Sequence, residues 1–312
     1  MAVRDAAAQQ PSRRPRIGVL WSGQDAEDQA PYREPLLAGF AELGHRIGQT
    51  IVLAERFAGG QAERFDADAQ DLVATRPDVI VAVSIACALA AQRATRTIPV
   101  VFLPPSDPVG LGLVRSLSHP GGNLTGISSI AYDLEAKRLQ ILRECIPGVA
   151  RLALLTDGLA PQSVLAETQR VAAAAGLASE VFLAPSRDRI EPAMRGIAQG
   201  RMDAVLMPAA RRILFNAKAE VARSALQWKL PLFAPAEYFT QDGALMSYGP
   251  NYSWMFRRVA WYVDRILAGA RPADLPVEQP SRLELWINQR TAAALGIEIP
   301  TGVLARADRV LE

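Results

Sequence analysis

The sequence predicts an α/β protein with two lobes, each a doubly wound parallel sheet with helices on both faces. Three observations predict this fold. Short apolar runs that suit buried strands alternate with amphipathic runs that suit helices. This alternation passes through about four βα units, and a second series of about four follows. Several predicted strands also end in small or polar residues, at the edge where open parallel sheets bind ligands.

The first series supplies the strands and helices of the first lobe. Its strands are predicted at Arg16–Trp21, Thr50–Phe57, Asp78–Val83 and Ile98–Leu103, with a further extended run at Leu124–Ser128. Its helices are predicted at Tyr32–Leu43, Ala62–Thr75, Cys87–Thr95 and Val109–Leu117. Gly44 follows the first of these helices directly, as is typical of a helix C-terminus.

The second series repeats this order, and a longer tail follows it. Its strands are predicted at Arg151–Leu155, Ala178–Leu183, Ala204–Met207 and Pro231–Ala234. Its helices are predicted at Leu134–Cys145, Pro161–Ala175, Arg187–Gln199 and Ile213–Trp228. The tail adds strands at Ala244–Tyr248 and Leu283–Ile287, a helix at Ser253–Ala268, and a helix from the N-cap Asn288 to Leu295. These last pieces need not all belong to the second lobe.

Composition limits the function classes. Half of the 312 residues are hydrophobic and 21% are charged, which is typical of a globular protein with a large core. The net charge of +2 argues against an electrostatic nucleic-acid binder. Cys87 and Cys145 lie in apolar helical patterns, which favours two separate buried thiols over a disulfide.

The N-terminus leaves two alternatives for the compartment. Residues 1–15 are predicted to be a disordered tail or the remnant of an export signal, because Ala6–Pro11 is similar to the small-residue end of a cleaved signal. An ordinary cytoplasmic start is the alternative. No apolar run reaches the roughly 18 residues of a membrane span.

Signatures of catalysis and metal binding are absent from the sequence. It has neither a Gly-x-Ser-x-Gly elbow nor a Gly-x-x-x-x-Gly-Lys phosphate loop. Gly110 and Gly112 are followed by Arg115, where a dinucleotide fingerprint needs glycine or alanine. His45 and His119 have no carboxylate or cysteine at ligand spacing. We therefore expect no catalytic residue, no metal and no cofactor.

The positive signal is a set of polar or small residues where predicted strands end. If both sheets direct these edges at one crevice, the residues surround a small molecule. They are Ser22, Gly23, Ser84, Ser106, Asp107, Asp157, Ala210, Arg211, Glu237 and Tyr238. Ile85, Ala86 and Ser129, which follow directly on such strand ends, complete the predicted ligand-binding set. The helices starting near Ala86 and Val109 offer free N–H groups, which suit a carboxylate.

Single members of this set also have simpler structural interpretations. Ser84 is equally suited to capping the helix that follows it. Asp107 before Pro108 is a common turn former. Glu237 is compatible with an acid at a solvated helix start, and Arg211 with a surface charge. The prediction of a ligand-binding site therefore rests on the whole set of residues and not on any single one.

With these residues in view, the chain resembles the bacterial ABC-transporter substrate-binding proteins of the tryptophan/tyrosine-type uptake family. The resemblance extends from Arg16 to Glu312 and rests on several short blocks in the family's order. The blocks are Ile17–Leu20, Ile98–Phe102, Asp107–Gly112, Pro120–Gly126, Ala136–Leu139, Leu245–Gly249, Ala273–Val277 and Leu304–Asp308. It implies a type I periplasmic-binding-protein fold, in which two lobes close on a ligand and the chain crosses between them three times.

The resemblance also implies lobe boundaries and contacts. Lobe 1 comprises residues 16–126 plus 249–279, and lobe 2 comprises residues 127–248 plus 280–312. The crossings are expected near Thr125–Ser129, Ala244–Tyr248 and Val277–Leu283. Ser22, Gly23, Ser84 and Asp107 would be first-lobe contacts, while Asp157, Ala210 and Glu237 would be second-lobe contacts. Asp157 departs from the asparagine common in similar proteins. Its carboxylate would favour an ammonium group on the ligand or, alternatively, only shift the selectivity.

The leading functional hypothesis is a non-catalytic, periplasmic solute receptor. It would act as a monomer, bind an amino-acid-like or aromatic carboxylate, and deliver it to an ABC permease in the inner membrane, without nucleic acid as a partner. The first alternative is a cytoplasmic ligand-sensing regulator, which would need a helix-turn-helix before Arg16. The second is a racemase-like cleft enzyme, which would need paired cysteines. Cys87 lies one turn beyond a strand end, but Cys145 lies near the end of a helix.

Overall fold

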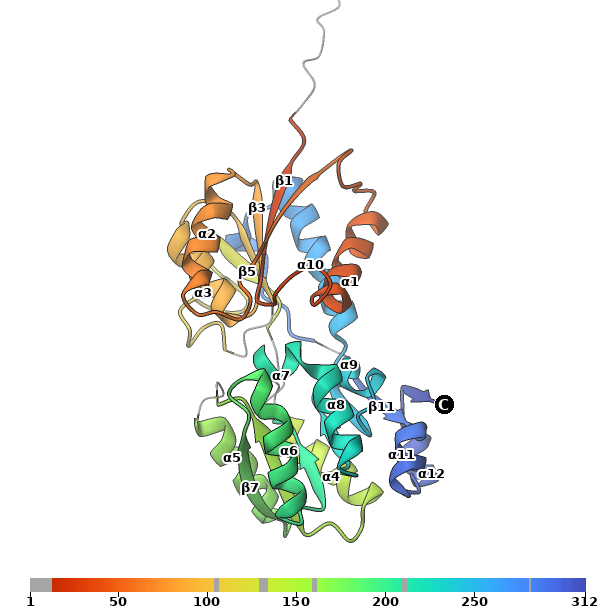
Figure 1. Cartoon of the computed structure of the whole chain (residues 1–312). Coiled ribbons are helices and arrows are strands. Elements are labelled where there is room, and N and C mark those ends of the chain that lie inside the picture. The colour runs from red at the N-terminus through yellow and green to blue at the C-terminus, as the bar shows by residue number, and fades with distance from the viewer. Residues whose placement is uncertain (1–12, 104–106, 129–133, 159–161, 209–211, 281) are drawn as a thin grey trace, which may run out of the picture.

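The computed structural model confirms the predicted fold class: two lobes, each containing one mainly parallel sheet (Figure 1). It describes residues 13–103, 107–128, 134–158, 162–208, 212–280 and 282–312. The first sheet has the strand order β2-β1-β3-β4-β5, and all neighbours are parallel. Its strands are β1 (Arg16–Trp21), β2 (Val52–Phe57), β3 (Val79–Val83), β4 (Val100–Leu103) and β5 (Leu124–Gly126).

Helices cover both faces of the first sheet. One face packs against α1 (Ala30–Glu42) and α10 (Tyr252–Leu267), and the other against α2 (Arg64–Ala74) and α3 (Ile85–Ala94). Val19 and Leu20 are neighbours on β1, yet Val19 lies in the core under α1 and α10 and Leu20 in the core under α2 and α3. A strand buried on both faces in this way needs a continuous apolar run, which explains its sequence.

The second sheet has the strand order β12-β11-β10-β9-β8-β6-β7. Its strands are β6 (Arg151–Thr156), β7 (Ala178–Leu183), β8 (Ala204–Leu206), β9 (Leu232–Ala234), β10 (Met246–Pro250), β11 (Leu283–Asn288) and β12 (Arg309–Leu311). β11 pairs antiparallel with β10, so the sheet is parallel except at that junction.

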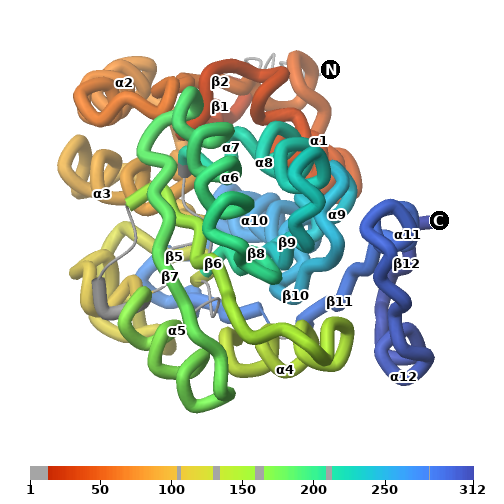
Figure 2. The backbone as a smooth tube through the Cα atoms, turned by 60° about the horizontal axis from the view of Figure 1, so that its bottom comes forward, coloured from red at the N-terminus to blue at the C-terminus, as the bar shows by residue number. Residues whose placement is uncertain are grey.

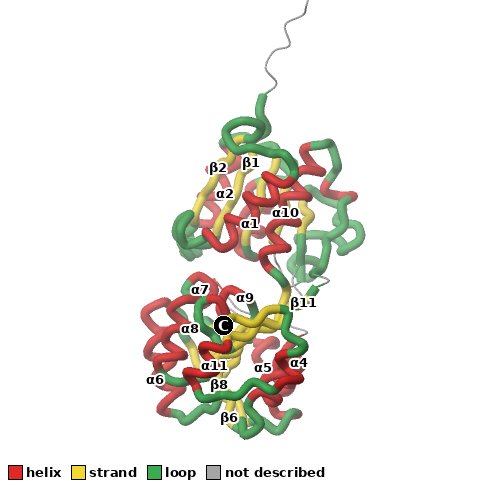
Figure 3. Tube along the Cα trace, turned by 90° about the vertical axis from the view of Figure 1, so that its right-hand side faces the viewer, coloured by secondary structure: helices red, strands yellow, loops and turns green. Residues whose placement is uncertain are grey.

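The helices of the second lobe also lie on both faces of its sheet (Figure 3). They are α4 (Glu135–Cys145), α5 (Gln162–Ala174), η2 (Arg187–Arg189), α6 (Ile190–Gln199), α7 (Arg212–Asn216), α8 (Lys218–Gln227), α9 (Glu237–Gln241), α11 (Gln289–Leu295) and α12 (Thr301–Leu304). The cores of the two faces are separate: α4, α5, α11 and α12 pack on one, and α6 and α8 on the other. Figure 2 shows α11, α12 and β12 together at one edge.

The structure corrects two predicted elements and adds others. Val109–Leu117 forms turns rather than a helix, because Gly112 adopts a φ of +68°. Gly112 N donates to Val109 O, and Leu113 N donates to Pro108 O. The helix predicted at Ile213–Trp228 is divided into α7 and α8 at Ala217. Strand β12 was not predicted at all.

The tail divides between the lobes. α10 packs against α1 on the first sheet, as predicted, and α11 and α12 pack on the second. The second crossing lies at Asn251 rather than near Ala244–Tyr248, because β10 continues in the second sheet to Pro250. The expected lobe boundary after Tyr248 therefore falls inside β10.

The other two crossing segments lie side by side. Ile127 and Glu278 form a parallel bridge, in which Ser128 N donates to Glu278 O at 2.9 Å and Glu278 N to Gly126 O at 3.1 Å. Gly126 has a φ of +149°, and a Cβ there would lie 2.1 Å from Phe102 O. Only glycine therefore allows the first crossing to leave β4 and β5 along this path.

Cys87 and Cys145 are both buried and are not joined in a disulfide, which confirms two separate thiols. Among the described residues, none of the helices has the length and apolar character that a membrane crossing requires.

Candidate functional site

The loop after β1 is organised around Gly23. Ser22 is buried, and a Cβ on Gly23 would come within 2.0 Å of the Gln29 amide and 2.2 Å of the Asp28 carboxylate. These two side chains fold over the glycine, and a larger residue at this position would have to displace them. Asp28 accepts a hydrogen bond from Gln24 N at 3.0 Å, which closes the loop on itself. The predicted contacts Ser22 and Gly23 belong to a tightly packed strand-end loop.

Ser84 lies at the end of β3 in an unusual backbone conformation. Its φ is +127°, and its Oγ accepts a hydrogen bond from Cys87 N at 3.2 Å. Ser84 therefore caps α3, as the simpler interpretation had it. A positive φ in a non-glycine residue is strained, and such strain concentrates at functional sites. Ile85 and Ala86 form the half-buried first turn of α3, where backbone N–H groups lack helical partners.

Asp107 is exposed in the structure, and its Oδ1 accepts a hydrogen bond from Gly110 N at 2.8 Å. This is the turn-forming role, and it occupies one of the two carboxylate oxygens. A ligand contact at Asp107 stays a prediction. Ser106, Ser129, Ala210 and Arg211 lie outside the described residues.

Asp157 is buried at the end of β6, and its Oδ2 accepts a hydrogen bond from Ile213 N at 3.0 Å. Ile213 belongs to the first turn of α7, so the carboxylate supports that helix at its positive end. The structure thus brings the loop after β6 into contact with the helix that follows β8. The two loops are adjacent because β6 and β8 pair directly.

Glu237 and Tyr238 lie at the start of α9 and contact α10, which belongs to the first lobe. Glu237 Oε1 accepts hydrogen bonds from Tyr252 N at 3.0 Å and Ser253 N at 3.4 Å, and Tyr238 OH lies 3.3 Å from Ser253 Oγ. Asn251 Oδ1 accepts from Trp254 N at 2.7 Å and caps the same helix. Both predicted ligand contacts therefore hold the second crossing.

Burial changes the acidity of Glu237. The pKa of this carboxyl is raised from 4.5 to about 7, mainly because burial desolvates the carboxylate and to a smaller extent because Glu284 is nearby. The backbone hydrogen bonds from the start of α10 oppose this change, because they favour the carboxylate.

The sequence did not predict an aromatic contact between the lobes. Tyr32, at the start of α1, packs against Phe215 of α7 and Tyr238 of α9, with ring centroids 5.4 and 4.9 Å away. Phe256 of α10 lies 5.5 Å from the same ring, and Tyr252 packs on Phe215 at 5.3 Å. We call these five residues the interlobe aromatic cluster. In the sequence they resemble ordinary core positions, and only the tertiary fold brings them together.

A buried ion pair joins two of the short blocks that carry the resemblance. Arg138 is 0% exposed, donates to Glu135 Oε1 at 2.6 Å, and donates through Nε to Tyr248 O at 2.8 Å. The pair therefore connects α4 to β10 just before the second crossing.

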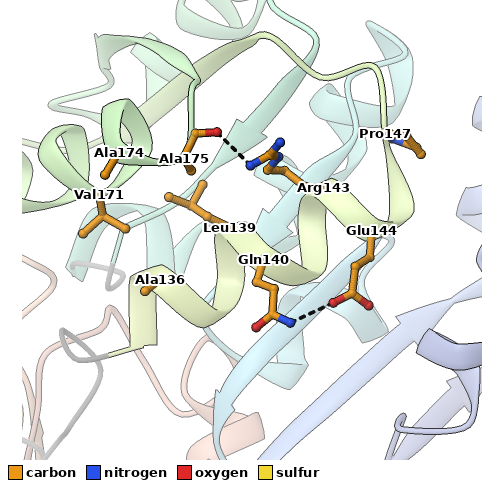
Figure 4. A pocket seen from close by; sticks show the side chains of 9 residues that line it. All are labelled: Ala136, Leu139, Gln140, Arg143, Glu144, Pro147, Val171, Ala174 and Ala175. Atoms are coloured by element: carbon orange, nitrogen blue, oxygen red, sulfur yellow. Dashed lines mark hydrogen bonds between the residues drawn. The ribbon is translucent and has the colours of Figure 1, made fainter.

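A surface groove of about 590 Å³ lies between α4 and α5 (Figure 4). None of the predicted ligand-binding residues lines it. Within it, Arg143 donates to Ala175 O at 2.8 Å and Gln140 to Glu144 Oε1 at 3.0 Å. In the part of the chain that the structure describes, no cluster of three or more His, Cys, Asp or Glu is suited to hold a metal.

The geometry defines a class of protein: two α/β lobes, three crossings, and polar strand-end loops near the junction. The model of the family described as ABC transporter substrate binding protein matches residues 25–311. The chain therefore belongs to this family of receptors, whose members bind a small molecule and deliver it to an ABC permease. They are extracellular or periplasmic binding proteins.

Three relatives illustrate the similarity. The Tyrosine-binding protein of Clostridioides difficile (strain R20291) is 25% identical over 277 residues, which cover 85% of this chain and 76% of that protein. A conserved domain protein from Vibrio cholerae has a TM-score of 0.84 at 28% identity, covering 95% and 99% of the two chains. A Streptococcus pneumoniae ABC domain in complex with L-Trp has a TM-score of 0.83 at 26% identity, covering 96% and 100%.

Proposed function

We propose that this receptor binds an aromatic amino acid, or a closely related amino-acid-like carboxylate, between its two lobes. The observation that carries this proposal is the similarity over nearly the whole chain to proteins described with tyrosine and with L-Trp. The high TM-score to the L-Trp complex counts both lobes together, which supports a similar arrangement of the lobes.

The proposed mechanism is a population shift between open and closed lobes. A ligand that contacts both lobes only when they are closed stabilises the closed state by its extra contacts. In the first lobe, the free N–H groups of the first turn of α3 after Ser84 suit the ligand carboxylate. In the second lobe, the Asp157 carboxylate suits the ligand ammonium group.

The remaining features belong to the same proposal. The lobes comprise residues 16–126 plus 249–279 and residues 127–248 plus 280–312, with the correction that β10 extends to Pro250 in the second sheet. The receptor works as a monomer in the periplasm, with an ABC permease of the inner membrane as its partner and without nucleic acid.

The racemase-like alternative receives no support from the thiols. Cys145 lies at the end of α4, and burial raises the pKa of its thiol to about 11. A proton-transfer cysteine needs an accessible thiolate near neutral pH, which this environment disfavours.

A thermal-shift panel tests the proposed ligand. L-tryptophan, L-tyrosine and L-phenylalanine are compared with tryptamine, which lacks the carboxylate, and indole-3-propionate, which lacks the ammonium group. A ligand at 100 times its Kd adds about 2.7 kcal/mol to the free energy of unfolding, a shift that melting curves resolve easily. We expect an aromatic amino acid to raise the Tm and both truncated analogues to lose most of the effect. A folded protein whose Tm none of the amino acids changes would contradict the proposal.

A further inference from the structure

The interlobe aromatic cluster is an apolar contact between the lobes, centred on the ring of Tyr32 in α1. From the first lobe it contains Tyr32, Tyr252 and Phe256, and from the second Phe215 and Tyr238. The ammonium group of Lys218, on α8, lies 5.7 Å from the centre of the Tyr32 ring. Close beside the cluster, Gln29 Nε2 lies 3.5 Å from Asn216 Oδ1. These contacts favour the lobe arrangement of this structure, because aromatic and cation–π pairs lose their partners when the lobes separate. We take this arrangement as the closed one, since the chain superposes on the L-Trp complex over both lobes.

The same cluster contains a group that favours opening. Tyr32 is only 3% exposed, and its hydroxyl has no hydrogen-bond partner among the residues that the structure describes. A buried hydroxyl without a partner is unfavourable, whereas an open junction would return it to water. Ring packing and the hydroxyl thus act in opposite directions on the same closure.

The cluster is also connected to a predicted ligand contact. Asp157 holds Ile213 N, and Phe215 lies two residues further along the short helix α7. A ligand that displaces the Asp157 carboxylate or neutralises its charge therefore acts on α7, the helix that carries Phe215. That ring in turn packs on Tyr32 of the other lobe.

We propose that Tyr32 and Phe215 are positioning residues that set the balance between open and closed lobes, with the Phe215 ring favouring closure and the Tyr32 hydroxyl favouring opening. The closure itself belongs to the proposed function. The balance between the two side chains, however, exists without a ligand and is measurable without one.

The test measures the ligand-free distance between the lobes. Spin labels are attached at Gln61→Cys in the first lobe and Arg189→Cys in the second, both at exposed positions. Labelling is selective because Cys87 and Cys145 are buried. Pulsed electron spin resonance then gives the distance distribution for four backgrounds: unchanged, Phe215→Ala, Tyr32→Phe and Phe182→Ala. Phe182 is the matched control, since it is a partly buried phenylalanine that packs against the core of the second lobe.

We expect opposite changes from the two junction variants. Phe215→Ala increases the ratio of open to closed protein about tenfold. Tyr32→Phe decreases that ratio about tenfold, because it removes the hydroxyl and keeps the ring. Phe182→Ala leaves the distribution unchanged even if it lowers the Tm.

Two results would overturn the proposal: a Phe215→Ala distribution equal to that of the unchanged background, or a Tyr32→Phe variant that opens the lobes or leaves them as they were. Circular dichroism shows which variants are folded, and Tyr32→Phe decides the question if Phe215→Ala fails to fold. Binding of L-tryptophan is measured separately on the same variants. An absence of binding with the expected distances would contradict the proposed ligand alone.

Discussion

The predicted ligand-binding residues of the two lobes differ in the hydrogen bonds that their side chains make. In the first lobe, Ser84 caps its own helix and Asp107 closes its own turn. In the second lobe, Asp157 holds the start of α7 and Glu237 holds the start of α10. α7 touches the first lobe through Phe215, and α10 itself belongs to the first lobe, where it packs on α1. The first lobe thus offers a locally fixed surface, while the second connects its polar side chains to the junction.

The largest expected effect comes from breaking the ion pair that supports β10 before the second crossing. Arg138→Met leaves Glu135 as a buried carboxylate that has lost its cation, which costs about 3–5 kcal/mol of unfolding free energy. Urea unfolding measures this loss. Arg143→Met is the matched control on the same helix, because Arg143 is exposed and its replacement is expected to cost about 0.5 kcal/mol or less. If Arg138→Met lowered the free energy of unfolding no more than the exposed control does, the buried pair would not support this region.

The titration of Glu237 tests the contact between the second lobe and α10. Its pKa of about 7 in the folded protein exceeds the ordinary 4.5, so between these values the folded state keeps a proton that the unfolded state releases. The free energy of unfolding therefore falls as pH rises from 4.5 to 7, by about 3 kcal/mol at most.

Glu237→Gln removes this titration, while its amide oxygen still accepts from the start of α10. We expect the contribution of this site to the pH dependence to disappear in denaturant titrations at pH 5, 6 and 7. Glu298→Gln, at an exposed position, is the control and is expected to follow the unchanged protein. A Glu237→Gln profile parallel to that of the unchanged protein would contradict the predicted titration.

Two substitutions of Asp157 distinguish its support of α7 from the effect of its charge on ligand binding. Asp157→Ala leaves Ile213 N without this acceptor and is expected to cost about 1–3 kcal/mol. Asp157→Asn retains an acceptor, so it should recover most of the Tm while weakening ligand binding if the charge meets an ammonium group. Thermal unfolding and binding titrations distinguish the two effects. Equal Tm losses in the two variants would argue against support of α7.

Ser84 is expected to show the smallest effect, because its bond is local to the first lobe. Ser84→Ala removes the cap of α3 at a cost of about 1 kcal/mol. Ser84→Gly removes the same cap but relieves the strain of the positive φ, and it should therefore be the more stable of the two. The opposite order of Tm values would show that the strain does not contribute.

The sequence predicted the sheets better than the loops, for physical reasons. A strand buried on both faces needs an apolar run such as Val79–Val83, and that run is visible without a structure. The turns at Val109–Leu117 have apolar residues at helical spacing, and the left-handed Gly112 overrides that pattern. Likewise, Ile213–Trp228 has no glycine or proline at the point where α7 and α8 separate.

The candidate site was predictable in part. Strand ends in a parallel sheet locate the loops, which is why Ser84, Asp157 and Glu237 were selected. Their hydrogen-bond partners were not predictable, because the sequence alone does not show which backbone groups pack beside them. Ile213 lies 56 residues from Asp157 in the sequence, and Tyr252 lies 15 residues from Glu237. Tyr32 and Phe215 were missed for the same reason, since nothing local distinguishes them from core residues.

Isothermal titration calorimetry with L-tryptophan and L-tyrosine tests the receptor account most directly. The account predicts saturable binding of at least one of them with one site per chain, and a negative ΔCp because closure buries apolar surface. A folded chain that gives no binding heat with either amino acid, at several temperatures and at millimolar concentration, would contradict it.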